Sequence, residues 1–229
     1  MKGPGVFSAA LAVFAKDLKA EWRTRIAVSA LLLFAFAVLV LVGYAVGPAQ
    51  ISKEDRPVVH SVLLWIVIFF SAMTGLSRVF VHEEESGTAA ALRLSAPSAS
   101  VYLGKLLSNL ALLALVLLFV VPLFLALMSF SIACWTLFLL VLLLGSLGLG
   151  AASTFTAAIV SKATAKGAMF AVLAIPLLMP PLVAAVAGTR IAATETSLAA
   201  GFDILQLLLA YDGVVTTATF LLFDAVFRE

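Results

Sequence analysis

Six runs of about twenty apolar residues constrain the fold of this chain more than any other feature of its sequence. A helix rises 1.5 Å per residue, so about twenty residues cross a hydrocarbon core of ~30 Å. The composition agrees, because 64% of the 229 residues are hydrophobic and only 11% are charged, whereas soluble domains are about a quarter charged. The sequence therefore predicts an all-α integral membrane protein with one membrane domain, residues 1–229, and six transmembrane helices at about 26–47, 58–76, 106–130, 135–160, 168–188 and 204–227.

The segment 6–24, before the first span, has the pattern of an amphipathic helix. A basic amphipathic helix beside a span is typical of a helix that lies in the membrane interface. A solvated helical tail is the alternative. The apolar face carries Phe7, Leu11, Phe14, Leu18 and Trp22, and the opposite face carries Lys16, Lys19 and Arg23.

The distribution of Lys and Arg between alternate loops predicts the orientation in the membrane. Eleven of the fourteen basic residues fall on one side, and only Lys53, Arg56 and Arg190 fall on the other. Cytoplasmic loops carry the excess of basic residues. Both termini and the connection 77–105 are therefore predicted to face the cytoplasm.

The connection 77–105 is the only sizeable polar stretch between two spans. Glu83, Glu84 and Glu85 precede a run of small residues that ends at Arg93, an order that suits the dipole of a short helix at both ends. A solvated loop with a charge cluster is the alternative, and the residues alone do not decide between the two.

Residues of this connection resemble the cytoplasmic loop of the CcmB family, the membrane subunit of the haem exporter used in cytochrome c maturation. The matching residues are Arg78, Phe80, Glu83, Glu85, Gly87, Thr88, Leu92, Pro97, Tyr102, Gly104 and Lys105. Further matches lie at 16–25, 175–181 and 202–215. The resemblance covers nearly the whole chain.

This resemblance implies an ABC-2-type permease of the bacterial inner membrane that delivers haem to a haem chaperone. Its cytoplasmic coupling loop would dock on an ATPase. The partners implied are a CcmA-like ATPase, CcmC-like and CcmD-like membrane subunits, and indirectly the chaperone CcmE. The resemblance implies haem as a possible cargo; no bound cofactor or metal site is predicted. The docking residues implied are Arg78, Phe80, Glu83, Glu84, Glu85, Gly87 and Arg93.

The chain carries no GxxxxGK[ST] loop for phosphates, so the sequence predicts a non-catalytic subunit whose partner uses the ATP. A permease of the same architecture for a lipid, polysaccharide or drug remains the alternative. An intramembrane protease is disfavoured, because no Ser/His pair, paired intramembrane aspartates or HExxH helix is present.

Three features inside the predicted spans are further candidates. Asp212 is an ionisable group at membrane depth, where a charge costs about 2.5 to 3.5 kcal/mol. It is a candidate for coupling, and a shallow, wetted position is the alternative. Pro176, Pro180 and Pro181 remove backbone donors and predict a hinge or a static bend. His60 is interpreted as an interfacial, hydrogen-bonded histidine rather than a haem ligand.

Overall fold

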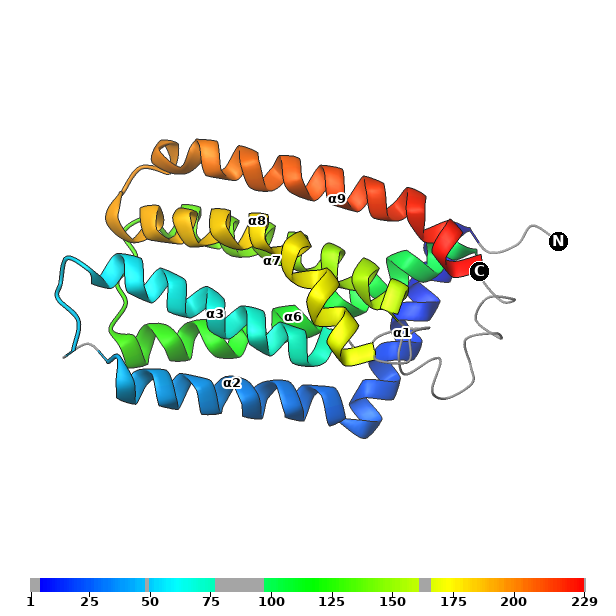
Figure 1. Cartoon of the computed structure of the whole chain (residues 1–229), viewed down its shortest axis with the longest axis horizontal. Helices are drawn as coiled ribbons and strands as arrows, with labels where there is room; N and C mark the ends of the chain where they lie inside the picture. Colours follow the sequence, from blue (N-terminus) through cyan, green and yellow to red (C-terminus); the bar gives the residue numbers. More distant parts are fainter. Residues whose placement is uncertain (1–4, 48–49, 77–96, 161–165, 229) are drawn as a thin grey trace.

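The computed structural model describes residues 5–47, 50–76, 97–160 and 166–228. All regular structure within these ranges is helical. Six long helices run side by side, and the shorter α1 crosses one end of the bundle (Figure 1). The elements are α1 (Val6–Thr24), α2 (Ile26–Ala45), α3 (Arg56–Leu76), α6 (Ser98–Met128), α7 (Trp135–Val160), α8 (Lys166–Thr194), the 3-10 helix η1 (Leu198–Gly201) and α9 (Phe202–Arg228).

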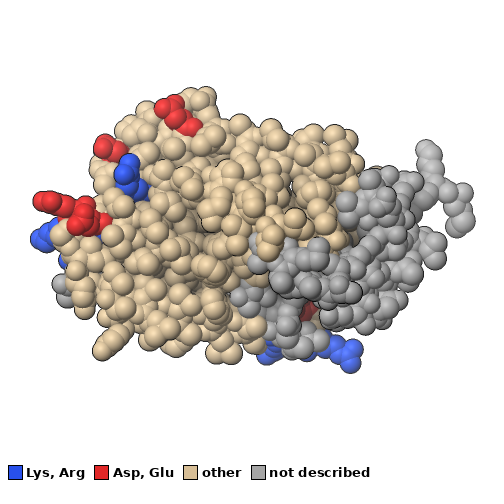
Figure 2. Space-filling view, viewed as in Figure 1, with Lys and Arg blue, Asp and Glu red and all other residues tan. Residues whose placement is uncertain are grey.

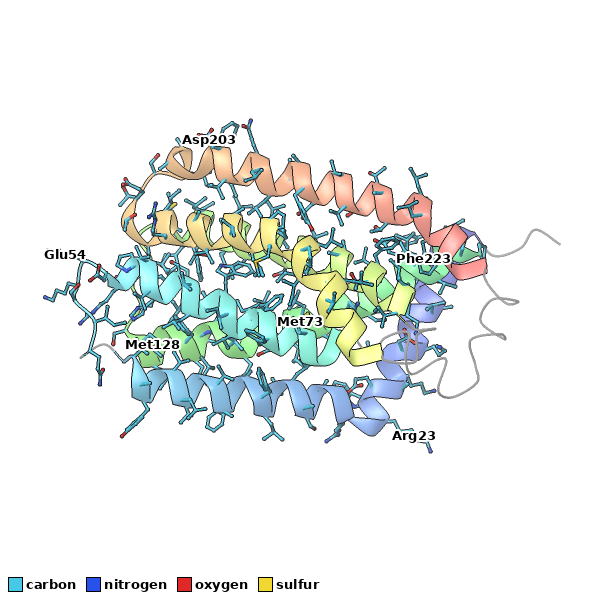
Figure 3. All side chains as sticks on the ribbon, viewed as in Figure 1. Arg23, Glu54, Met73, Met128, Asp203 and Phe223 are labelled. Atoms are coloured by element: carbon cyan, nitrogen blue, oxygen red, sulfur yellow. The ribbon has the colours of Figure 1, made fainter. Side chains whose placement is uncertain are left out.

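The six long helices are each long and apolar enough to cross a membrane. On the face that Figure 2 shows, the Lys, Arg, Asp and Glu side chains lie towards the ends of the bundle and leave an apolar surface between them. Glu54 and Asp203 lie at the end formed by residues 50–55, 129–134 and 195–201, which we call the distal end. Arg23 and Phe223 lie towards the other end, beside α1 (Figure 3). The chain is therefore an all-α integral membrane protein.

Helix α7 is the most buried of the six long helices and packs against α3, α6, α8 and α9. Its glycines allow this close approach. A Cβ on Gly145 would lie 2.5 Å from the Trp65 ring of α3, and one on Gly150 would lie 2.6 Å from Leu110 of α6. The small residues of α7 thus face neighbours in the same chain. Substitution by larger residues would push these helices apart.

Helix α1 has three faces rather than the two that the sequence pattern predicts. Ala10 and Val13 are buried, and α1 packs along the first turns of α6, where a Cβ on Gly104 would lie 2.6 Å from Val13 Cβ. Phe7 and Trp22, on the apolar face, remain exposed to the surroundings of the bundle. An exposed apolar face at the end of a membrane bundle suits contact with lipid.

Helix α6 begins at Ser98, although the sequence pattern places the start of the third span at 106. The connection predicted over 77–105 is therefore shorter, and its last residues form the first two turns of α6. The polar side chains in these turns obscure the helix in the sequence. Tyr102 meets Thr219 of α9 with 2.6 Å between the hydroxyl oxygens, and Lys105 pairs with Asp17 of α1.

Candidate functional site

The prolines of α8 free a backbone carbonyl that a tyrosine of α9 then satisfies. A proline has no N–H, so Pro181 cannot donate to the carbonyl of Leu177, four residues earlier in the helix. Tyr211 Oη donates to this oxygen at 2.5 Å. In a membrane an unsatisfied backbone group costs several kcal/mol. The side chain from α9 therefore replaces the bond that the proline removes from α8.

Asp212 follows Tyr211 and is enclosed at the same level of the bundle. Its side chain belongs to a residue that is 6% exposed, and both carboxyl oxygens lack a hydrogen-bond partner among the described residues. A Cβ on Gly148 of α7 would lie 2.8 Å from Asp212 Oδ1 and 3.3 Å from Pro181 Cβ. The absence of a side chain at Gly148 thus leaves the space that the carboxyl group occupies.

These contacts form one cluster at mid-depth in the bundle, which we call the Asp212 cluster. It comprises Gly148, Leu177, Pro181, Tyr211 and Asp212. Asp212 is ten residues from Phe202 and eleven from Phe223, which is about 15 and 17 Å along a helix. Gly148 has a similar position in α7, thirteen residues after Trp135. The shallow, wetted position considered for Asp212 is therefore wrong. The predicted role of Asp212 in coupling stays a prediction.

A second site joins α1 to α6 at the α1 end of the bundle. Lys105 Nζ lies 2.9 Å from Asp17 Oδ2, with only 2% of the lysine side chain and 15% of the aspartate side chain exposed. Ser108 Oγ donates to the same carboxylate at 3.3 Å, and Ser100 Oγ donates to the Val6 carbonyl at 2.9 Å. Breaking a buried pair by removing one partner is costly, so these contacts fix α1 on the start of α6.

His60 is fully buried near the start of α3, at the distal end. Its ring stands edge-on to Phe124 and Phe130, with centroids 6.1 and 5.3 Å away. Neither ring nitrogen has a hydrogen-bond partner among the described residues. The hydrogen bonds predicted for His60 are therefore wrong, because the imidazole packs as an aromatic ring. Its interfacial position stays a prediction, and its place in the first turns of α3 agrees with it.

The predicted docking residues lie outside the described residues. They are Arg78, Phe80, Glu83, Glu84, Glu85, Gly87 and Arg93. Two of the candidates that the sequence singles out inside the spans, Asp212 and Pro181, lie in the same cluster. Pro176 and Pro180 lie in the same helix but on its exposed side.

Sequence reasoning missed Tyr211 and the pairing of Asp17 with Lys105. A signal for the tyrosine was present, because a membrane proline requires another donor for the carbonyl that it frees. Tyr211 is one of only three tyrosines. The ion pair had no such signal, because 88 residues separate its partners along the chain.

The sequence was compared with models of known protein families. A family model described as CcmB protein matches residues 8–227. The chain belongs to the CcmB family. CcmB proteins are membrane permease subunits of the haem exporter for cytochrome c maturation, which is consistent with the predicted non-catalytic role. A comparison with curated proteins gives no match.

Proposed function

We propose that this CcmB-family chain transmits ATP-driven motion from a partner ATPase into its six spans while haem is delivered to a haem chaperone. The match to the CcmB family over residues 8–227 carries this proposal. The sequence supports the division of labour, because the chain has no phosphate-binding GxxxxGK[ST] loop of its own. A CcmA-like subunit supplies the ATPase in this proposal, and CcmC-like and CcmD-like subunits complete the membrane part.

The contacts of α6 supply a route for the motion. Helix α6 starts at Ser98, directly after the segment proposed to dock on the ATPase. Its first two turns are bound to α1 through Ser100, Gly104 and Lys105. A displacement of the docking segment would therefore move α1 and α6 together. A partner shifts such an equilibrium only if it binds two conformations with different affinity.

The proposed orientation places the α1 end in the cytoplasm of a bacterial inner membrane. Lys16, Lys19 and Arg23 of α1 and Lys105 of α6 lie towards this end, whereas Lys53, Arg56 and Arg190 belong to the distal end. The bias of basic residues towards cytoplasmic loops supports this assignment. The ATPase, which needs cytoplasmic ATP, would then meet the chain beside α1.

Co-purification with the ATPase tests the proposal. The chain is co-expressed with a CcmA-like ATPase, and Glu83, Glu84 and Glu85 are changed together to Ala. We expect the ATPase to co-purify with the wild-type chain and to be lost, or uncoupled in its ATP hydrolysis, with the triple variant. The matched control changes three exposed acids of the distal end to Ala, namely Glu54, Glu195 and Asp203.

This control removes the same charge at the opposite end and should retain the ATPase. If no ATPase associates even with the wild-type chain, the proposed coupling is refuted. Equal loss of the ATPase in both triple variants would refute the docking segment alone.

A further inference from the structure

We propose that Asp212 is a proton-binding site inside the bundle, where the side chain is held as a neutral carboxylic acid. The ligand is a single proton from water, bound to one carboxyl oxygen. This inference concerns the resting chain and is independent of the cargo and of the ATPase partner. It rests on the position, the enclosure and the neighbours of the side chain.

Enclosure is the first observation. Asp212 is 6% exposed at mid-depth, between α9 and the glycine face of α7. Gly148 and Pro181 present no polar side-chain atom to it, and neither carboxyl oxygen has a hydrogen-bond donor among the described residues. A carboxylate here would have neither water nor a donor to replace its hydration.

The second observation is that the described helices packed against α9 place no countercharge at the level of Asp212. The elements packed against α9 are α6, α7, α8 and η1. Neither α7 nor η1 contains an ionisable side chain, and those of α8 are Lys166 and Arg190, towards its two ends. Those of α6 are Tyr102 and Lys105, in its first two turns, where they contact Thr219 and Asp17.

Helix α9 itself offers no cation near Asp212. Within two turns of Asp212, the other ionisable side chain of α9 is that of Tyr211, whose hydroxyl already donates to the Leu177 carbonyl. The nearest others along the helix are Asp203 in its first turn and Asp224 and Arg228 in its last turns. None of these lies at the level of the cluster.

The cost of desolvation decides the charge state. Burying an isolated carboxylate in a medium of low dielectric constant is far more costly than burying a neutral polar group without a partner, so such a group neutralises instead. The neutral acid is therefore the form that this enclosure tolerates. The space left by Gly148 accommodates it.

Infrared spectroscopy of the full chain in lipid bilayers at neutral pH tests the proposal. A protonated carboxylic acid has a C=O band distinct from that of a carboxylate. We expect such a band to shift when the chain is labelled with carboxyl-13C aspartate, and to disappear in Asp212→Asn. The control Asp17→Asn removes a carboxylate that pairs with Lys105 and should leave the band unchanged.

Absence of an isotope-sensitive band in the wild-type chain would overturn the proposal without any variant. Persistence of the band in Asp212→Asn would overturn it too, because another aspartate would then carry the proton. Asn is similar in shape to the neutral acid, so we also expect Asp212→Asn to accumulate in the membrane at the wild-type level. Loss of the variant in the presence of the partner subunits would instead indicate a charged Asp212 that pairs with one of them.

Discussion

The bond from Tyr211 to the Leu177 carbonyl should stabilise the bundle only because position 181 is a proline. Tyr211→Phe keeps the ring and removes the donor. Polar contacts between helices in membranes are worth about 0.6 kcal/mol on average and at most about 1.7. Leaving the acceptor buried and unsatisfied costs about 1 to 3 kcal/mol. We therefore expect Tyr211→Phe to lower the free energy of unfolding by about 1 to 2 kcal/mol.

A double-mutant cycle isolates the cause. Pro181→Ala restores an N–H that can donate to the Leu177 carbonyl within α8. In that background the loss of the tyrosine hydroxyl should cost less than about 0.5 kcal/mol, because the carbonyl keeps a partner. Pro180→Ala is the matched control. It restores a donor to the carbonyl of Pro176, so the cost of Tyr211→Phe should stay at its wild-type value.

Reversible unfolding of the purified chain in mixed detergent micelles measures the cost of Tyr211→Phe in each of the three backgrounds. A change of 1 to 2 kcal/mol corresponds to about a 5- to 30-fold change in the ratio of folded to unfolded protein. Tryptophan fluorescence reports the transition, and the buried Trp65 makes it sensitive to loss of the bundle. An equal cost of Tyr211→Phe in the wild-type and Pro181→Ala backgrounds would refute the reasoning.

Two further pairs of substitutions test other contacts of the bundle. Gly148→Ala places a Cβ 2.8 Å from Asp212 Oδ1, so it should lower the free energy of unfolding by about 1 to 3 kcal/mol through overpacking. The control Gly213→Ala adds a Cβ that meets nothing within 4 Å, so it should be neutral or stabilising in the same unfolding assay. For the pair that joins α1 to α6, Asp17→Asn and Lys105→Met should be non-additive, with a coupling energy of about 1 to 3 kcal/mol; additive effects on unfolding would show that the ion pair contributes nothing.

The sequence predicts the membrane class and the helices because long apolar runs have few alternatives in a bilayer. It also identifies the segment 6–24 as amphipathic, and α1 spans Val6–Thr24. The third face of α1 could not be read from the periodicity, because Ala10 and Val13 are small and form no strong apolar stripe. Their burial depends on Gly104, which is far along the chain.

The polar contacts of the spans were harder to predict than the spans themselves. A hydropathy pattern excludes Tyr102 and Lys105 from the predicted third span because their side chains are polar. In the structure, each side chain has a partner in another helix, so both residues belong to α6. Asp212 and Pro181 stand out in the sequence because each breaks a rule for lipid-exposed helices. Their proximity depends on how α7, α8 and α9 pack, and no local pattern encodes that packing.

We propose above that ATP hydrolysis by a partner moves the spans of this chain. The most direct measurement is a spin-label distance between Val58 of α3 and Leu207 of α9, two exposed positions near the distal end. Both carry cysteine labels in a Cys134→Ser background, since Cys134 is the single native cysteine. We predict that the distance distribution differs between the nucleotide-free and ATP-trapped complexes in lipid bilayers. An unchanged distribution, while the partner hydrolyses ATP at its normal rate, would contradict the proposed coupling.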